Sequence, residues 1–367
     1  MAQLSPIGQP REALDTPALL VDLDVLQSNI ARMARTIVQE AGVGWRPHIK
    51  GIKTPAIAHL LLRAGALGLT CAKLGEAEVM AAAGIRDLLI ANQIVGAQKI
   101  ARLVNLCRHA EVVVAVDSLE NAEELGQAAT AKGVELRVVI EVDTGMQRAG
   151  VAPGEAAVAL ARQLAALQGL RFAGLMTWES PALRIKDHKE RQQLIAGLLG
   201  QLTTTAQACR DAGLQVEIVS CGGSGTYWLS AFEPGITEVQ AGGGVFNDVV
   251  YCRQLGLDHP FALRVLSTVT SRPAPTRIIC DAGKKTMSAA EALPEPLGLP
   301  QVQSLALSAE HGKIELVAPS DTPRLGEKIE FIPGCVDTTV VLHDELYGIR
   351  KGIVETVWPL LARGRLQ

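Results

Sequence analysis

Short apolar runs recur along the first two thirds of the chain, with amphipathic stretches between them. The stretches at 26–40, 74–83 and 155–167 carry apolar residues at helical spacing, which predicts helices that bury one face. The runs between such stretches have the length of strands, and they lie at 18–22, 45–50, 67–72, 88–92, 112–116, 137–142, 173–178 and 217–221. Eight strands that alternate with helices predict a parallel sheet, and eight is the number that closes a (β/α)8 TIM-type barrel.

An open, doubly wound sheet is the alternative for the same alternation. In that fold the turn after the first strand carries closely spaced glycines that accept a dinucleotide. Here the turn reads Leu23-Asp24-Val25. The dinucleotide fingerprint is absent there, which favours the barrel.

The pattern changes after about residue 255, where short β-branched segments are separated by Pro, Gly or Asp turns. Such segments are typical of an antiparallel β domain with few helices. They lie at 263–270, 276–280, 302–308, 313–317, 328–332 and 339–342. The boundary is therefore expected near 252–262, with the barrel over 14–252 and the β domain over 253–367 together with residues 1–13.

Composition narrows the class of protein. A chain of 367 residues is long enough for a barrel of about 250 residues and a smaller domain. The net charge of −3 gives no basic surplus, which argues against nucleic acid and anionic membranes as partners. No uncharged apolar run of about 18 residues is present, and the first residues lack the order of a signal peptide. The seven cysteines are scattered singly without a CxxC pair, which suits reduced thiols in a cytoplasm.

Lys50 is the first candidate for chemistry. It closes the segment Arg46-Pro47-His48-Ile49-Lys50, and a lysine at the carboxyl end of a barrel strand points into the mouth that holds active sites. Partly desolvated there, its amine can attack a carbonyl, as Schiff-base lysines do. From position alone, a surface lysine at a strand end is the better interpretation. Three other lysines compete for the role, namely Lys53, Lys284 and Lys285.

Two glycine runs suggest an anion site. The segment Gly222-Gly223-Ser224-Gly225-Thr226 follows the last predicted barrel strand, and Gly242-Gly243-Gly244 follows a strand-like stretch. Glycines let backbone N–H groups converge on an anion, and the loops after the seventh and eighth barrel strands often hold phosphate. A flexible turn is the alternative for either run taken alone.

Two further groups are weaker candidates. Arg148 lies on the glycine-punctuated loop 143–150, where it can pair with a phenolate or carboxylate or be an ordinary solvated arginine. In the β domain, Cys335 and Asp337 are two residues apart and can ligate a divalent ion, with Glu310-His311-Gly312 nearby in the sequence. Two ligands do not hold a structural zinc, so a turn with a buried thiol is an equal alternative.

In chain order these residues resemble the D-threonine aldolase, D-serine dehydratase and 3-hydroxy-D-aspartate aldolase family, which has the alanine-racemase-like fold (fold type III) of pyridoxal phosphate enzymes. The similarity runs nearly from end to end. Family-like stretches include Arg46-Pro47-His48-x-Lys50, Gly145-x-x-Arg148-x-Gly150, Gly222 to Tyr227, Asp281-Ala282-Gly283-x-Lys285 and Leu342-His343-Asp344.

The resemblance implies that Lys50 is the catalytic Schiff-base lysine that bonds pyridoxal 5'-phosphate. It implies that Arg148 lies near the phenolic oxygen of the cofactor and the loop 222–226 on its phosphate. It also assigns cofactor binding to His48, Trp178 and Tyr251. In this family two subunits share their active sites, so the resemblance implies a homodimer.

The sequence departs from the family pattern where a metal is expected. The family motif places a histidine where this chain has Cys335, within Pro333-Gly334-Cys335-Val336-Asp337. The family's histidines after the strand at 173–178 are also replaced, since this chain reads Trp178-Glu179-Ser180. Cys335 and Asp337 with Glu179 are one way to rebuild a site for a zinc or manganese ion. Loss of the metal is the other.

The leading hypothesis is a pyridoxal phosphate-dependent lyase that acts on a D-β-hydroxy amino acid, by retro-aldol cleavage or dehydration. The alternative is a metal-independent amino acid racemase of the same fold, with Lys50 as one base. A cofactor carrier without turnover is a third hypothesis. The predicted β domain after residue 252 argues against it, since small carriers of that kind have the barrel alone.

Overall fold

Eight parallel strands form the sheet of the barrel unit in the computed structural model, which describes residues 5–367. In spatial order the strands are β2 (Gly44–Trp45), β9 (Glu238–Val239), β8 (Ile218–Cys221), β7 (Leu170–Met176), β6 (Leu136–Glu141), β5 (Glu111–Val116), β4 (Asp87–Gln93) and β3 (Leu69–Cys71). A parallel bridge between His48 and Thr70 joins the first strand to the last one in this order. The sheet is thus a closed barrel, as predicted.

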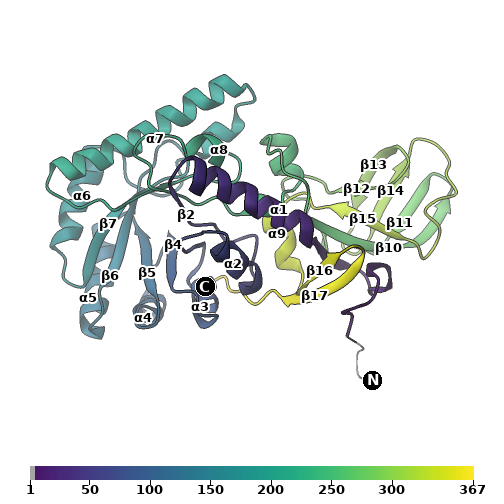
Figure 1. The fold of residues 1–367 in the computed structure, drawn as a ribbon, viewed down its shortest axis with the longest axis horizontal. Coiled ribbons are helices and arrows are strands. Elements are labelled where there is room, and N and C mark those ends of the chain that lie inside the picture. Colours follow the sequence, from purple (N-terminus) through teal and green to yellow (C-terminus); the bar gives the residue numbers. More distant parts are fainter. Residues whose placement is uncertain (1–4) are drawn as a thin grey trace. The chain divides into compact units, whose positions relative to one another are not determined.

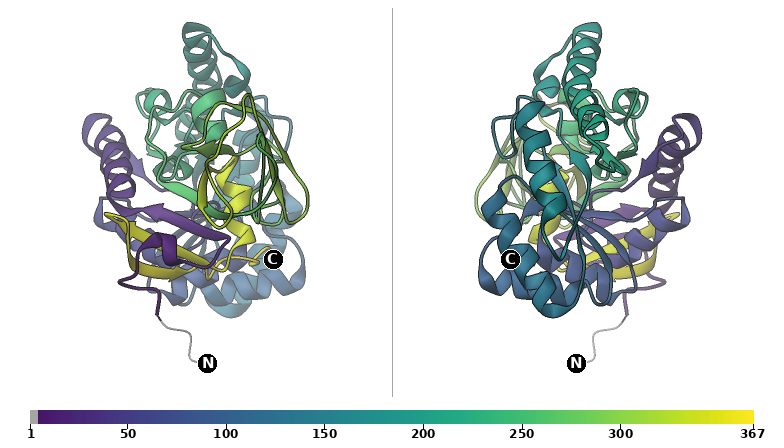
Figure 2. Two further views of the ribbon diagram at one scale, coloured as in Figure 1. Left: turned by 90° about the vertical axis from the view of Figure 1, so that its right-hand side faces the viewer. Right: turned by 90° about the vertical axis from the view of Figure 1, so that its left-hand side faces the viewer.

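Helices cover the outside of the barrel strands (Figures 1 and 2). They are α2 (Pro55–Arg63), α3 (Leu74–Ala82), α4 (Ala97–Leu106), α5 (Leu119–Lys132), α6 (Glu155–Ala166), α7 (His188–Asp211) and the short α8 (Tyr227–Ser230). In α5, the Ser118 side chain accepts the N–H of Asn121 at the start, and Gly133 in the left-handed region ends the helix. The predicted helices at 74–83 and 155–167 are confirmed. The predicted helix at 26–40 is α1 (Leu23–Ala34), continued by a π-helix over Arg35–Glu40.

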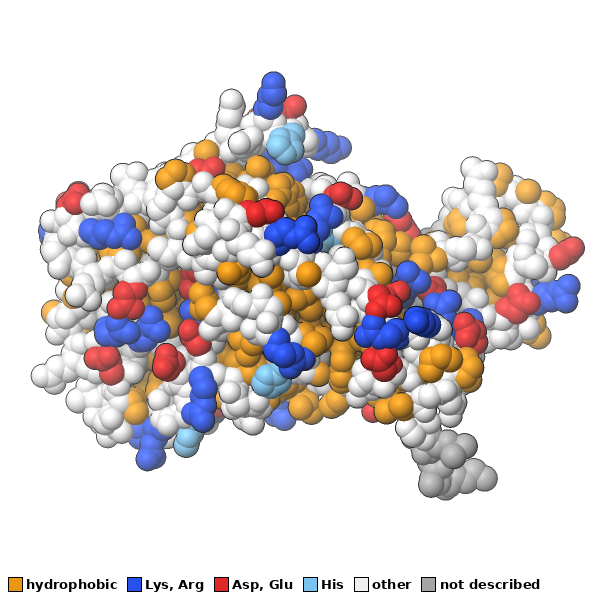
Figure 3. Space-filling model, in the orientation of Figure 1, with side chains coloured by type: hydrophobic (Ala, Val, Ile, Leu, Met, Phe, Trp, Pro, Cys, Tyr) orange, Lys and Arg blue, Asp and Glu red, His pale blue; other side chains and the backbone are white. Residues whose placement is uncertain are grey.

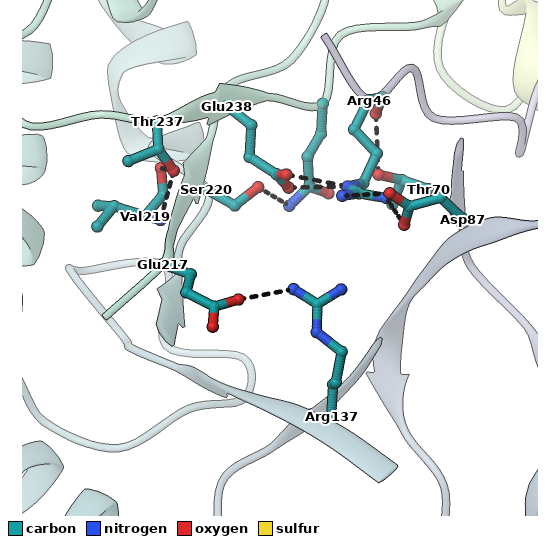
Figure 4. Close-up of polar contacts among 10 residues, drawn as sticks. Arg46, Thr70, Asp87, Arg137, Glu217, Val219, Ser220, Thr237 and Glu238 are labelled. Atoms are coloured by element: carbon teal, nitrogen blue, oxygen red, sulfur yellow. Dashed lines mark hydrogen bonds and ion pairs between the residues drawn. The ribbon is translucent and has the colours of Figure 1, made fainter. Parts of the chain in front are cut away.

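A buried arginine ties three barrel strands together (Figure 4). Arg46, only 3% exposed, follows β2, and its Nε lies 3.0 Å from both carboxylate oxygens of Glu238 on β9. Its Nη1 lies 2.6 Å from Oδ1 of Asp87, the first residue of β4. A buried charge loses its hydration and needs an opposite charge to offset that cost. Here the guanidinium and the two carboxylates supply it for one another.

The second unit is built on a nine-stranded sheet. Its strands run in the order β13 (Val302–Leu307), β14 (Gly312–Leu316), β11 (Arg277–Cys280), β10 (Leu263–Ala274), β1 (Ala18–Asp22), β16 (Glu345–Arg350) and β17 (Ile353–Pro359), with β15 (Lys328–Ile332) on β10 and β12 (Glu295–Leu297) on β15. All pairs are antiparallel except β1 with β16. The antiparallel β domain is confirmed, with this one parallel pair added.

The strand at 18–22 was wrongly placed in the barrel. It is a central strand of the second unit, where Leu20 pairs with Arg264 on one side and with Tyr347 on the other. A short apolar run predicts a strand buried on both faces, but it does not say in which sheet. The eighth barrel strand is instead β9, which spans two residues and carries a charged side chain inward.

The extent of the two units follows from this change. The second unit takes residues up to Ile30, Gly51–Thr54 and Gly243–Arg363, while the barrel unit takes Ala31–Lys50, Pro55–Gly242 and Gly364–Gln367. The barrel therefore begins later than the expected residue 14 and ends before residue 252. Residues 1–4, expected in the β domain, lie outside the described residues.

One predicted strand of the β domain is wrong. The segment 339–342 forms the end of α9 (Val336–Thr339) and a 3-10 turn over Val340–Leu342. Its β-branched residues favour a strand locally, but the Val336 N–H donates to the buried Asp248 carboxylate at 2.7 Å. A tertiary contact thus overrides the local preference.

Candidate active site

Lys50 stands at the carboxyl end of the first barrel strand. Between this strand and Lys50, the His48 N–H donates to the Gln240 carbonyl at 2.9 Å, and His48 bridges to Thr70 on the other side. The Lys50 backbone N–H donates to Nδ1 of His48 at 3.3 Å. Neighbouring strands on both sides therefore fix the segment, at the end of the barrel where active sites are built.

Trp178 is the residue at which the predicted site residues meet. It follows β7, and its ring centroid lies 5.5 Å from Nζ of Lys50 and 5.9 Å from Cζ of Arg148. Both distances lie within the range of about 6 Å over which a cation is attracted to an aromatic face. Three residues that are far apart in the sequence are thus brought together by the barrel.

The Arg148 side chain is held by a buried carboxylate. Its Nη2 lies 3.2 Å from Oε1 of Glu141, the last residue of β6, which is 5% exposed. The Gln93 amide donates to the other oxygen of Glu141 at 2.7 Å. The carboxylate is therefore satisfied on both oxygens, and it restrains the guanidinium beside the Trp178 ring.

The glycine loop after β8 is organised by Glu179. This fully buried carboxylate accepts the Gly222 N–H at 3.1 Å, the Thr226 hydroxyl at 2.6 Å and the Ser230 hydroxyl at 2.5 Å. The Gly223 N–H donates to the Thr226 hydroxyl at 3.1 Å. Charge-assisted hydrogen bonds from three donors therefore fix the shape of the loop.

Both oxygens of Glu179 accept hydrogen bonds from the glycine loop, so the role that the structure gives this carboxylate is to anchor the loop. Its suggested place in a metal site stays a prediction. The role as loop anchor was missed in the sequence, because a glutamate after a strand does not reveal which donors face it. The four-residue spacing of Gly222, Thr226 and Ser230 along the chain is the only sequence signal that points to it.

The second glycine run follows β9, the eighth barrel strand. The two glycine runs therefore follow the seventh and eighth barrel strands, where phosphate is often held. Gly242 packs on the His48 backbone, and an added Cβ at Gly243 would come 2.7 Å from Oη of Tyr251. The second unit thus places the Tyr251 hydroxyl beside this second run.

The competing lysines have other surroundings. Lys53 is buried, and its carbonyl accepts the Ala362 N–H at 3.0 Å. Lys285 is exposed and pairs with Glu310 at 2.7 Å. Lys284 is also exposed. Among the four lysines, Lys50 is the one found against an aromatic face in the described part of the chain.

Cys335 and Asp337 lie on one turn of the second unit. Cys335 precedes the first residue of α9, and Asp337 is in the first turn of that helix. Burial raises the pKa of the Cys335 thiol to about 11. Residues 5–367 contain no group of three or more His, Cys, Asp or Glu side chains that is arranged to hold a metal ion.

On the face shown in Figure 3, acidic and basic side chains are interspersed, and neither sign forms a continuous patch. None of the helices described between residues 5 and 367 has the length and apolar character needed to cross a bilayer.

Comparison with known proteins places the chain in a family. Residues 21–248 match the alanine racemase N-terminal domain family, and residues 262–349 match a serine dehydratase domain. D-threonine aldolase of Arthrobacter sp. is 36% identical over 97% of this chain and 95% of its own length. 3-Hydroxy-D-aspartate aldolase of Paracoccus denitrificans is 33% identical over 98% and 94%, respectively.

A solved structure shows the same fold throughout. D-threonine aldolase from Filomicrobium marinum superposes with a TM-score of 0.94 at 36% identity, and covers 98% of this chain and 99% of that one. The similarity therefore includes both units rather than the barrel alone. The chain belongs to the alanine racemase N-terminal domain family and, within it, to the lyase branch that holds D-threonine aldolase and 3-hydroxy-D-aspartate aldolase.

Proposed function

We propose that the chain is a pyridoxal phosphate-dependent lyase for a D-β-hydroxy amino acid, with Lys50 as the residue that bonds the cofactor. One observation carries the proposal. The Lys50 amine and the glycine loop meet at the same indole, because Trp178 faces Nζ of Lys50 and its Nε1 lies against Gly223. This cofactor needs two attachment points. An amine bonds its aldehyde, and an anion-binding loop holds its phosphate.

The residues present fit the cofactor. An added Cβ at Gly223 would come 3.0 Å from Nε1 of Trp178, and that Nε1 is buried without a hydrogen-bond partner among the described residues. The site thus combines the Trp178 indole N–H, which is a hydrogen-bond donor, with bare loop backbone at Gly223. Residues of the loop 222–226 would hold the phosphate, and Arg148 would face the phenolic oxygen.

The chain's own residues then set the chemistry. The bound cofactor supplies an electron sink for the bonds of the substrate Cα. Nζ of Lys50 would be the atom that takes or returns a proton at the substrate Cα. Nζ of Lys50 lies 5.5 Å from the centroid of the Trp178 ring, which helps to position it. Arg148, fixed by Glu141, keeps a second positive charge beside the same ring.

A divalent ion does not fit the donors that the second unit brings together. Cys335 and Asp337 supply two ligands, and the thiol with a pKa of about 11 would have to lose its proton to coordinate. No third donor of the described residues joins them. The proposed mechanism therefore contains no step through a metal.

Adding a side chain at Gly223 should weaken binding of the cofactor. Gly223→Val puts a branched side chain onto Nε1 of Trp178, so we expect retention of the cofactor to fall by about a hundredfold or more, with the fold intact. Gly197→Val is the control, since no atom lies within 4 Å of an added Cβ there. Equilibrium dialysis measures retention, and circular dichroism reports the fold. Unchanged retention in Gly223→Val would place the phosphate elsewhere.

The reaction is tested by offering D-threonine, D-serine and both D-3-hydroxyaspartate diastereomers. We expect either an aldehyde with glycine or a keto acid with ammonia, and no turnover of L-threonine. Parallel reactions with and without a chelator should have equal rates, because the donor set lacks a third ligand. Inverted amino acid as the sole product would refute the lyase and establish the racemase.

Assembly and location remain predictions of the same proposal. The substrate is the small-molecule partner, and a homodimer is expected in solution, which light scattering would measure. All seven cysteines are free thiols in the structure, in keeping with the predicted cytoplasmic location.

A further inference from the structure

The indole N–H of Trp178 has no acceptor among residues 5–367, where its Nε1 is buried and makes no hydrogen bond. An indole nitrogen is a donor only, and a buried donor without an acceptor costs free energy. Such an atom at a binding site points to a ligand that accepts from it.

Gly223 is explained by close packing on the indole rather than by backbone conformation. Its φ lies outside the left-handed region, unlike Gly222 with φ of +83°, so another residue could adopt the backbone at 223. A side chain there would press on the indole, since an added Cβ would come 3.0 Å from Nε1 of Trp178. The glycine therefore lets the nitrogen edge of the indole lie against the loop backbone.

Several amides of the loop are engaged within the protein. The Gly222 N–H donates to Glu179 and the Gly223 N–H to the Thr226 hydroxyl. The N–H groups of Thr226 and Tyr227 both donate to the Gly223 carbonyl, at 3.1 and 3.0 Å. A donor from another element would therefore strengthen an anion site here.

We propose that the indole N–H of Trp178 donates a hydrogen bond to the phosphate ester of the cofactor, as the side-chain donor that completes the glycine loop. This inference rests on the proposed function and refines it. It gives Trp178 two separate faces of contact. The ring face meets Lys50 and Arg148, while the nitrogen edge faces the anion.

Trp178→Phe separates the two contacts, because it keeps an aromatic face and removes the donor. The full-length chain, freed of cofactor, is titrated with pyridoxal phosphate and with pyridoxal, which has the same aldehyde and ring but no phosphate. We expect the Kd for pyridoxal phosphate to rise about tenfold or more, as for loss of a hydrogen bond to a charged group, and the Kd for pyridoxal to change less than about twofold. Trp228→Phe is the matched control, since it removes another indole from the helix directly after the loop.

The outcomes are distinct. Equal weakening of both ligands would show that the indole acts only through its ring, and an unchanged Kd for both would show that the N–H is not used. Either result overturns the inference and leaves the proposed function in place. If the unaltered chain binds pyridoxal phosphate no more tightly than pyridoxal, the phosphate site of the proposed function fails instead.

Discussion

Lys50→Ala should abolish the visible absorption of the purified protein and lower its activity by about a thousandfold or more. In the proposed function the Lys50 amine bonds the cofactor aldehyde and also carries the substrate proton. Both functions depend on Nζ, which lies 5.5 Å from the Trp178 ring. Absorption spectra of equal protein concentrations measure the first effect, and steady-state rates measure the second.

Lys285→Ala is the matched control for this experiment. Lys285 is exposed and pairs with Glu310 on the surface, so its loss should leave spectrum and rate unchanged. Borohydride reduction of the unaltered protein, followed by peptide mapping, should label Lys50. A label on Lys53, Lys284 or Lys285 would contradict the assignment.

Arg46→Met should lower the free energy of unfolding by about 3–5 kcal/mol, because it leaves two carboxylates without their buried partner. Arg46 touches Glu238 and Asp87, which belong to different strands of the barrel. Domains are stable by only about 5–15 kcal/mol, so this is a large part of the total. Urea denaturation followed by circular dichroism measures the loss as a shift of the barrel's unfolding midpoint.

Arg137→Met offers a control within the same barrel (Figure 4). Arg137 pairs with Glu217 at 3.1 Å, but the two side chains are 20% and 41% exposed. A solvated pair contributes about 0–1 kcal/mol. If Arg46→Met and Arg137→Met shift the midpoint equally, the Arg46 network does not stabilise the barrel in the way described.

The fold was predictable where a pattern extends over several residues. The runs at 112–116 and 137–142 became β5 and β6, because contiguous apolar residues fit a strand covered on both faces. β9 was not predictable in this way. It spans two residues, and Glu238 faces inward only because Arg46, almost two hundred positions earlier, neutralises it. Nothing in the residues next to Glu238 in the sequence indicates that Arg46 is its partner.

Candidate site residues could be picked out where a residue type is unusual for its position in the sequence. Lys50 at a strand end and the glycines at 222 and 223 stand out in the sequence, and the structure places Lys50 and Gly223 beside Trp178, while their roles stay predictions. The role of Glu179 did not emerge, since its meaning lies in three donors that only the folded loop brings to it. The resemblance to a family implies the cofactor, but it did not identify the residue that shapes the loop.

The position of β1 in the second sheet has a consequence for how the protein is made. Leu20 leaves the ribosome early, whereas its partners Arg264 and Tyr347 are synthesised near the end of the chain. At the usual speed of translation the interval is on the order of tens of seconds. During that time an apolar strand with both edges open waits while the barrel segments emerge and fold. The nascent chain therefore carries an aggregation-prone segment that a chaperone has reason to bind until β10 and β16 are made.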